Sequence, residues 1–191
     1  MGICESLKNK NQEKNLRKSK TSEGMDFKKE GKKNENNNIK YCKLSEIIKN
    51  PIWFPKEFKP EHFQQGNLGD CFFISTMEAI SKFPEMIRSL FKNPDLFDPS
   101  ADYFEIEYGN PKKTKKIENK FVYEVDMYGN KYLKYSKPFE GACFLVILEK
   151  FYAELVGGYE ELDNGGCEKN AFINILGNLG VKAKEMKKKF I

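Results

Sequence analysis

Cys71 is the residue of this sequence best placed for chemistry. It follows the segment Gln65-Gly66-Asn67-Leu68-Gly69-Asp70, a pattern that predicts a loop running into a buried helix, with Asp70 as the N-cap. Backbone N–H groups and the positive end of the helix dipole favour a thiolate there, the nucleophilic form of cysteine. If the loop folds back, the Gln65 amide and the Cys71 N–H could form an oxyanion hole. The alternative for a lone cysteine is an inert core residue.

A second stretch supports the catalytic interpretation. It reads Leu148-Glu149-Lys150-Phe151-Tyr152-Ala153-Glu154-Leu155, then Gly158-Tyr159-Glu160-Glu161-Leu162 and Gly165-Gly166. The two stretches, in this order, resemble the calpain family of papain-like cysteine proteases, which carry a Gln-Gly-x-x-Gly-Asp-Cys run and a Leu-Glu-Lys-Ala-Tyr-Ala-Lys helix. The resemblance implies that Cys71 is the nucleophile and Gln65 the oxyanion glutamine of an intracellular endopeptidase that cleaves protein substrates. It also implies an α+β fold, the first subdomain of the papain-like core, in which further helices and short strands pack around a central Cys-bearing helix.

The rest of the catalytic machinery is not evident. The resemblance covers residues 53–177, and the family's histidine base and orienting asparagine lie further downstream. His62 is the single histidine and lies nine positions before Cys71. In papain-like enzymes the base approaches from the opposite subdomain, so we do not expect His62 to act as the base. Because a Cys–His enzyme needs both groups within hydrogen-bond reach, we expect little or no peptidase activity from the chain alone.

Three interpretations of function remain open. The first is the N-terminal part of a membrane-anchored calpain-type cysteine endopeptidase whose other half is absent from this sequence. The second is a non-catalytic, membrane-tethered scaffold that binds substrates or partner peptides, or docks on a complementary protease half. The third is an inert relic of the family. The retained nucleophile segment favours the first interpretation, whereas the missing base favours the second for these 191 residues.

Two departures from the family pattern affect what the site can bind. Phe72 follows the nucleophile where the family usually has tryptophan. The family also holds calcium in this half through acidic side chains, but the matching positions here are His62 and Ala142. Calcium prefers oxygen ligands, so the resemblance allows calcium while its acidic ligands are replaced. No other cofactor is indicated.

The charge of the chain is concentrated at its N-terminus. Residues 1–40 carry 11 Lys and Arg against 6 Asp and Glu, whereas residues 41–191 carry 22 of each. We predict a disordered, basic tail over 1–40, a protease-core subdomain over 41–181 and a basic end over 182–191.

The first six residues, Met-Gly-Ile-Cys-Glu-Ser, fit N-myristoylation of Gly2, with Cys4 as a palmitoylation target. With the basic cluster that follows, they predict attachment to a membrane surface. The alternative is a chance match on a solvated tail.

Other sequence features suggest a cytoplasmic protein, which the predicted acylation would place at the cytoplasmic face of a membrane. The sequence has no apolar run of membrane-spanning length and no secretory signal. Its five cysteines are scattered without metal-type pairing, which favours a reducing compartment. A lysine-rich stretch, residues 112–116, reads as a solvated hairpin or loop tip, and without flanking aromatic residues that could stack on bases we expect no nucleic-acid partner.

Hydrophobic periodicity predicts the elements that position these residues. We expect helices over 43–49, 71–83, 83–91, 142–156 and 170–176, and strands over 103–108 and 121–127. The helix over 142–156 has the clearest apolar face, with Gly157-Gly158 as its stop. The resemblance places it against the helix that begins at Cys71.

Overall fold

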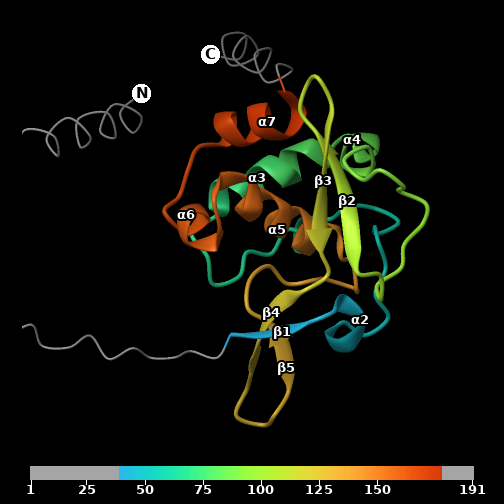
Figure 1. The fold of residues 1–191 in the computed structure, drawn as a ribbon, viewed down its shortest axis with the longest axis vertical. Helices are drawn as coiled ribbons and strands as arrows, with labels where there is room; N and C mark the ends of the chain where they lie inside the picture. Colours follow the sequence, from blue (N-terminus) through green and yellow to red (C-terminus); the bar gives the residue numbers. More distant parts are fainter. Residues whose placement is uncertain (1–38, 178–191) are drawn as a thin grey trace, which may run out of the picture. The chain divides into compact units, whose positions relative to one another are not determined.

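The computed structural model describes residues 39–177, and this part of the chain combines helices with small antiparallel sheets, as the α+β prediction requires (Figure 1). No helix within it has both the length and the apolar character needed to cross a bilayer. Three predictions fall outside the described residues. They are the acylation sites Gly2 and Cys4, almost all of the tail over 1–40, and the basic end at 182–191.

Three of the described helices have nine residues or more, and the others have four or five. Their bounds are α2 (Leu44–Ile47), α3 (Cys71–Ile80), α4 (Pro84–Arg88), α5 (Phe144–Val156), α6 (Tyr159–Asp163) and α7 (Glu168–Leu176), with a 3-10 turn η1 over Pro60–His62. The strands are β1 (Lys40–Cys42), β2 (Tyr103–Tyr108), β3 (Lys113–Glu118), β4 (Phe121–Val125) and β5 (Lys131–Leu133). They form two antiparallel sheets, one with the order β1-β4-β5 and one made of β2 and β3.

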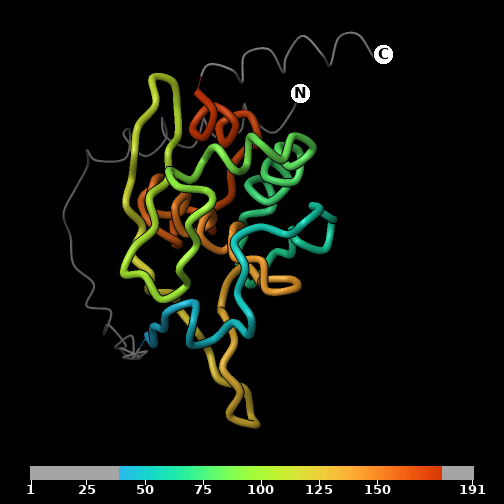
Figure 2. Tube along the Cα trace, turned by 90° about the vertical axis from the view of Figure 1, so that its right-hand side faces the viewer, coloured from blue at the N-terminus to red at the C-terminus, as the bar shows by residue number. Residues whose placement is uncertain are grey.

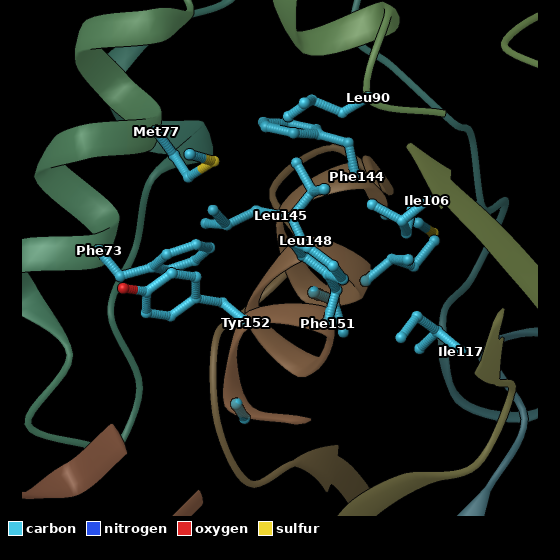
Figure 3. Packing of buried hydrophobic residues seen from close by; sticks show 14 of the residues in the cluster. Phe73, Met77, Leu90, Ile106, Ile117, Phe144, Leu145, Leu148, Phe151 and Tyr152 are labelled. Atoms are coloured by element: carbon cyan, nitrogen blue, oxygen red, sulfur yellow. The ribbon is translucent and has the colours of Figure 1, made fainter. Parts of the chain in front are cut away.

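Helix α5 lies at the centre of the described fold, and the other elements pack around it. Nine of its 13 residues are buried, so the helix is covered on more sides than the single apolar face that its sequence suggested. Strands β2 and β3 and helix α6 all contact α5, and side chains from α3 reach it as well (Figure 3). A helix that is apolar nearly all round is stable only when it is surrounded in this way.

Helix α3 is fixed to α5 by aromatic contact. The rings of Phe73 on α3 and Tyr152 on α5 stack with centroids 4.9 Å apart and an interplanar angle of 24° (Figure 3). Met77, one turn further along α3, is also fully buried. The prediction that these two helices lie against each other is therefore correct at the level of the side chains that touch.

The segment before α3 also runs along α5. The Ile52 N–H donates to the Gly141 carbonyl at 2.9 Å, and the Cys143 N–H donates to the Ile52 carbonyl at 2.9 Å. In Figure 2 this segment is the blue-to-cyan tube that passes the orange start of α5. The chain is thus bonded to the residues just before α5 before it enters the loop that carries Gln65.

Several predicted boundaries were wrong. Helix α3 ends at Ile80 and not at Phe83, because Phe83 precedes a proline and adopts φ −124° and ψ 84°, outside the helical region. Helix α2 covers only four residues of the predicted 43–49, and α4 only five of 83–91. Strands β1 and β5 and helix α6 were not predicted; the two strands have three residues each, too few to show a periodic pattern.

The lysine-rich stretch lies in a hairpin, the first of its two predicted forms, and not at a loop tip. Lys112 lies in the turn, and residues 113–118 form β3, which pairs with β2. The Lys115 Nζ lies 3.2 Å from a carboxylate oxygen of Glu154 on α5, and the Lys116 Nζ lies 4.1 Å from the ring centroid of Tyr103. These lysines are engaged with the fold itself.

We predict that Phe73→Ala lowers the free energy of unfolding by about 3–5 kcal/mol, because it removes a fully buried ring and leaves a cavity between α3 and α5. Urea denaturation followed by circular dichroism would measure the change. Phe83→Ala is the matched control: its side chain is 59% exposed, so its cost should stay below about 1 kcal/mol. Equal losses in the two variants would contradict this account of the interface.

Candidate active site

Cys71 is exposed at the first residue of α3. Cys42 and Cys143 are buried, and burial raises the pKa of their thiols to about 11 and about 12. Cys167 is half-buried. Among the cysteines of residues 39–177, Cys71 is thus the one open to a substrate, and the alternative of an inert core cysteine is wrong.

Asp70 occupies the N-cap position but does not cap the helix with its side chain. Its backbone carbonyl accepts the N–H groups of Phe73 and Ile74, at 2.8 and 3.1 Å. Its carboxyl group turns inward, is fully buried and makes no capping hydrogen bond. A capping side chain bonds the second or third N–H of a helix, here that of Phe72 or Phe73, so the Cys71 N–H is not used by an aspartate cap.

Gln65 lies in the loop before α3, and its side chain is bonded within that loop. Its Nε2 donates to the Leu68 carbonyl at 2.5 Å. An amide nitrogen carries two hydrogens, so this bond fixes the side chain and leaves a second hydrogen for another acceptor. The role of Gln65 as an oxyanion donor stays a prediction.

Two glycines allow the loop to pack closely on the segments around it. A Cβ on Gly66 would lie 2.0 Å from the Tyr135 carbonyl oxygen, and one on Gly69 would lie 2.6 Å from the Asp163 carbonyl oxygen. The Gly69 N–H also donates to the Asp163 side chain at 2.6 Å. The end of α6 therefore holds the loop two residues before Cys71.

The two sequence motifs meet at the start of α3. The Phe72 ring lies 6.0 Å from the Tyr152 ring, and Gly166 sits against Phe72, where a Cβ would lie 2.7 Å from a ring carbon. Phe72, which replaces the family's usual tryptophan, is thus a packing residue between α5 and the Gly165-Gly166 turn.

Behind Cys71, two acidic side chains are buried together, and sequence reasoning missed this pair. Asp70 is 0% exposed and Glu149 is 1% exposed. Burial, and then the negative charge of Asp70, raise the pKa of Glu149 well above its ordinary value. Burial also raises the pKa of Asp70. The available signal was the position of Glu149 within a stretch that is otherwise largely apolar.

His62 is buried at the end of η1, and its recorded contacts are with neighbouring groups. Its Nδ1 accepts the Lys59 N–H at 3.0 Å. Its ring packs edge-on against Phe139, with centroids 5.3 Å apart, and its Nε2 lies 4.0 Å from a Glu140 carboxylate oxygen. Within the described residues no hydrogen bond links His62 to Cys71, so the geometry gives His62 no catalytic role.

The described residues do not suit calcium at the positions that the resemblance indicated. The His62 side chain offers no oxygen ligand and is buried against an aromatic ring, and the Ala142 side chain has no ligand atom. Across residues 39–177 no three His, Cys, Asp or Glu side chains are grouped so as to hold a metal ion.

We predict that Asp163→Ala speeds hydrogen exchange at the Gly69 amide by about tenfold, because it removes the carboxylate that accepts this N–H. Exchange measured by NMR would test this. Asp163→Asn, which keeps an oxygen acceptor, should exchange much closer to the wild-type rate. Unchanged exchange in Asp163→Ala would mean that α6 does not hold the loop.

Comparison with known proteins agrees with this geometry. A family model described as calpain family cysteine protease matches residues 13–190, a longer range than the motifs alone covered. A search of curated proteins finds no match. Since the family match spans most of the 191 residues and the exposed cysteine lies at the start of a helix, the chain belongs to the calpain family of cysteine proteases.

Proposed function

We propose that this chain supplies the nucleophile half of a calpain-type cysteine endopeptidase. The observation that carries the proposal is the exposure of Cys71 at the first residue of α3, in a chain of the calpain family. The substrates would be extended segments of proteins. The second catalytic group would come from a complementary half of the core, either further along a longer chain or from a partner.

The proposed reaction assigns a role to each group. The Cys71 sulfur attacks the carbonyl carbon of a peptide bond, and the Cys71 N–H and the Gln65 amide receive the oxyanion. Collapse of this intermediate requires that the departing amine gain a proton. His62 is buried and bonded elsewhere, so it does not supply that proton. The complementary half must therefore bring a group that takes the proton of the Cys71 thiol, gives it to the departing amine and then activates the water that hydrolyses the acyl-enzyme. We propose that calcium bound in this half plays no part.

A non-catalytic scaffold is the second candidate. It is favoured by one observation, the burial of the chain's single histidine. Without a base, the exposed face around Cys71 would hold an extended peptide or a protease half without cleaving it. The two candidates share the same surface and differ in whether a complementary half restores turnover.

We predict that the chain alone does not cleave a fluorogenic peptide, and that adding a separately produced calpain second subdomain, which carries His and Asn, produces cleavage. Cys71→Ser should abolish that cleavage. Gln65→Ala should lower kcat by about 10²–10³-fold, because an oxyanion donor is lost. Gln64→Ala, a neighbouring exposed glutamine, should leave kcat unchanged.

The outcomes separate the two candidates. Cleavage that requires Cys71 supports the protease half. Binding of the second subdomain, shown by ultracentrifugation, without any cleavage would support the scaffold instead. An equal effect of the Gln65 and Gln64 substitutions would remove Gln65 from the oxyanion hole.

We also propose that the N-terminus is acylated and places the chain at the cytoplasmic face of a membrane, on the strength of Gly2, Cys4 and the basic cluster that follows them. Intact mass of the protein from its native cells should show the added mass of a myristoyl group. Gly2→Ala should remove this mass and release the protein from the membrane fraction. An unmodified wild-type N-terminus would refute the proposal.

A further inference from the structure

The buried acids Asp70 and Glu149 lie at the junction between the nucleophile segment and α5. Neither carboxylate oxygen of Asp70 accepts a hydrogen bond of standard geometry within the described residues, although the group is fully buried. A buried polar group without a donor calls for an explanation, because native structures satisfy nearly all such groups.

The carboxyl group of Glu149 supplies the explanation. The rings of Phe72 and Phe73, which follow Asp70, contact Tyr152, one turn after Glu149 on α5. The two buried acids therefore lie at the same contact between α3 and α5, and the negative charge of Asp70 adds to burial in raising the pKa of Glu149. Glu149 is held in place from the other side, since its Oε2 accepts the Ser136 N–H at 3.0 Å. Two ionised carboxylates cannot donate to one another, whereas a single proton between them makes one a donor and the other an acceptor.

Among residues 39–177, the groups that act on the pair include no positive charge that would keep both carboxyls ionised. Asp70 is faced by the Gln65 amide from the loop and by Asp163 from α6. Lys150, the next residue after Glu149, turns its Nζ to the carbonyl oxygens of Glu118 and Lys120, each at 2.7 Å.

Two tyrosines complete the shell around Glu149. Tyr135 and Tyr159 stack with centroids 3.9 Å apart, and burial raises the pKa of both hydroxyls above the ordinary tyrosine value. Both therefore stay neutral at physiological pH. Cys71, next to Asp70 in the chain, is the remaining titratable group at this place.

We propose that Asp70 and Glu149 share one proton and act as a positioning pair that fixes the segment from Gln65 to Cys71 against α5. The proton bond joins the residue directly before the nucleophile to the central helix of the fold. Asp163 holds the same segment from outside through the Gly69 N–H. The shared proton is inferred from the burial of both carboxyls and the missing hydrogen-bond partners of Asp70, and its significance for catalysis rests on the proposed function above.

The proposal gives stability a defined pH dependence. Between the ordinary carboxyl pKa and the raised pKa of the pair, the folded chain keeps a proton that the unfolded chain releases, since both carboxyls ionise at ordinary values once exposed. The raised pKa of the pair therefore stabilises the folded state at low pH. This contribution is lost as pH rises from the ordinary carboxyl range toward the raised value.

The test compares urea unfolding of the full chain with that of Glu149→Gln between about pH 5 and pH 8. Per pH unit, the wild-type unfolding constant should rise by up to about tenfold more than that of the variant, which corresponds to one released proton. Asp70→Asn should remove the same dependence, and the double variant should remove no more. Parallel pH profiles in wild type and both single variants would overturn the shared proton.

Two further readouts separate a proton bond from mere packing. Infrared difference spectra at neutral pH should show the carbonyl stretch of a protonated carboxylic acid in the wild type, and Glu149→Gln should lose it. Exchange at the Gly69 amide should rise about tenfold in Glu149→Ala and return toward the wild-type rate in Glu149→Gln, relative to the buried Ile106 amide in β2, which monitors global unfolding. Equal exchange at Gly69 in all three proteins would overturn the positioning role.

Failure of this proposal is distinguishable from failure of the proposed function. The proton linkage is measured on the chain alone, without any cleavage, whereas the protease half is tested with a complementary subdomain. A linked proton together with no restored cleavage would leave the pair standing and refute the catalytic role. Restored cleavage without a linked proton would support the catalytic role and refute the shared proton.

Discussion

The packing of α3 on α5 is the interaction on which the rest of the described structure depends. The stacked rings of Phe73 and Tyr152 fix the direction in which α3 begins, and Cys71 is the first residue of that helix. A nucleophile on a helix buried along most of its length cannot shift without moving the core, because close-packed interiors resist small displacements. The packing of the core therefore determines where Cys71 is exposed at the surface.

The parts of the fold that sequence predicted well are those with strong local signals. The long apolar run of α5 and the alternation in β2 each identify their element without reference to distant residues. The position of Cys71 at a helix start followed from the glycines and Asp70 just before it, and the structure agrees. By contrast, the charged residues of β3 did not identify a strand. The partners of these lysines lie far along the chain, among them Glu154 on α5. No local pattern contains that information.

Asp70 shows a second limit of local reasoning. Aspartate before a helix predicts an N-cap, since its carboxylate usually accepts the first free N–H groups. Asp70 occupies the predicted N-cap position, but its carboxyl group is buried in the interior and makes no capping hydrogen bond. In our proposal its partner is Glu149, far along the chain. Only the three-dimensional meeting of the two motifs reveals this, and it also explains how an acidic residue can occur on the buried side of α5.

The contacts that hold the site around Cys71 are separate from the groups that would carry out catalysis. The contacts that hold the Gln65 loop come from this chain itself, since the Gly69 N–H donates to Asp163 and Gly66 packs against Tyr135. The loop leads into α3, which stacks on α5. None of these contacts involves a histidine, so the geometry around Cys71 can be stable without a catalytic base. The exposed Cys71 therefore shows that the supporting core is intact and does not by itself show turnover. If the chain is a protease half, as we propose, catalysis needs a group from the complementary half, and restored cleavage distinguishes this from a scaffold with the same surface.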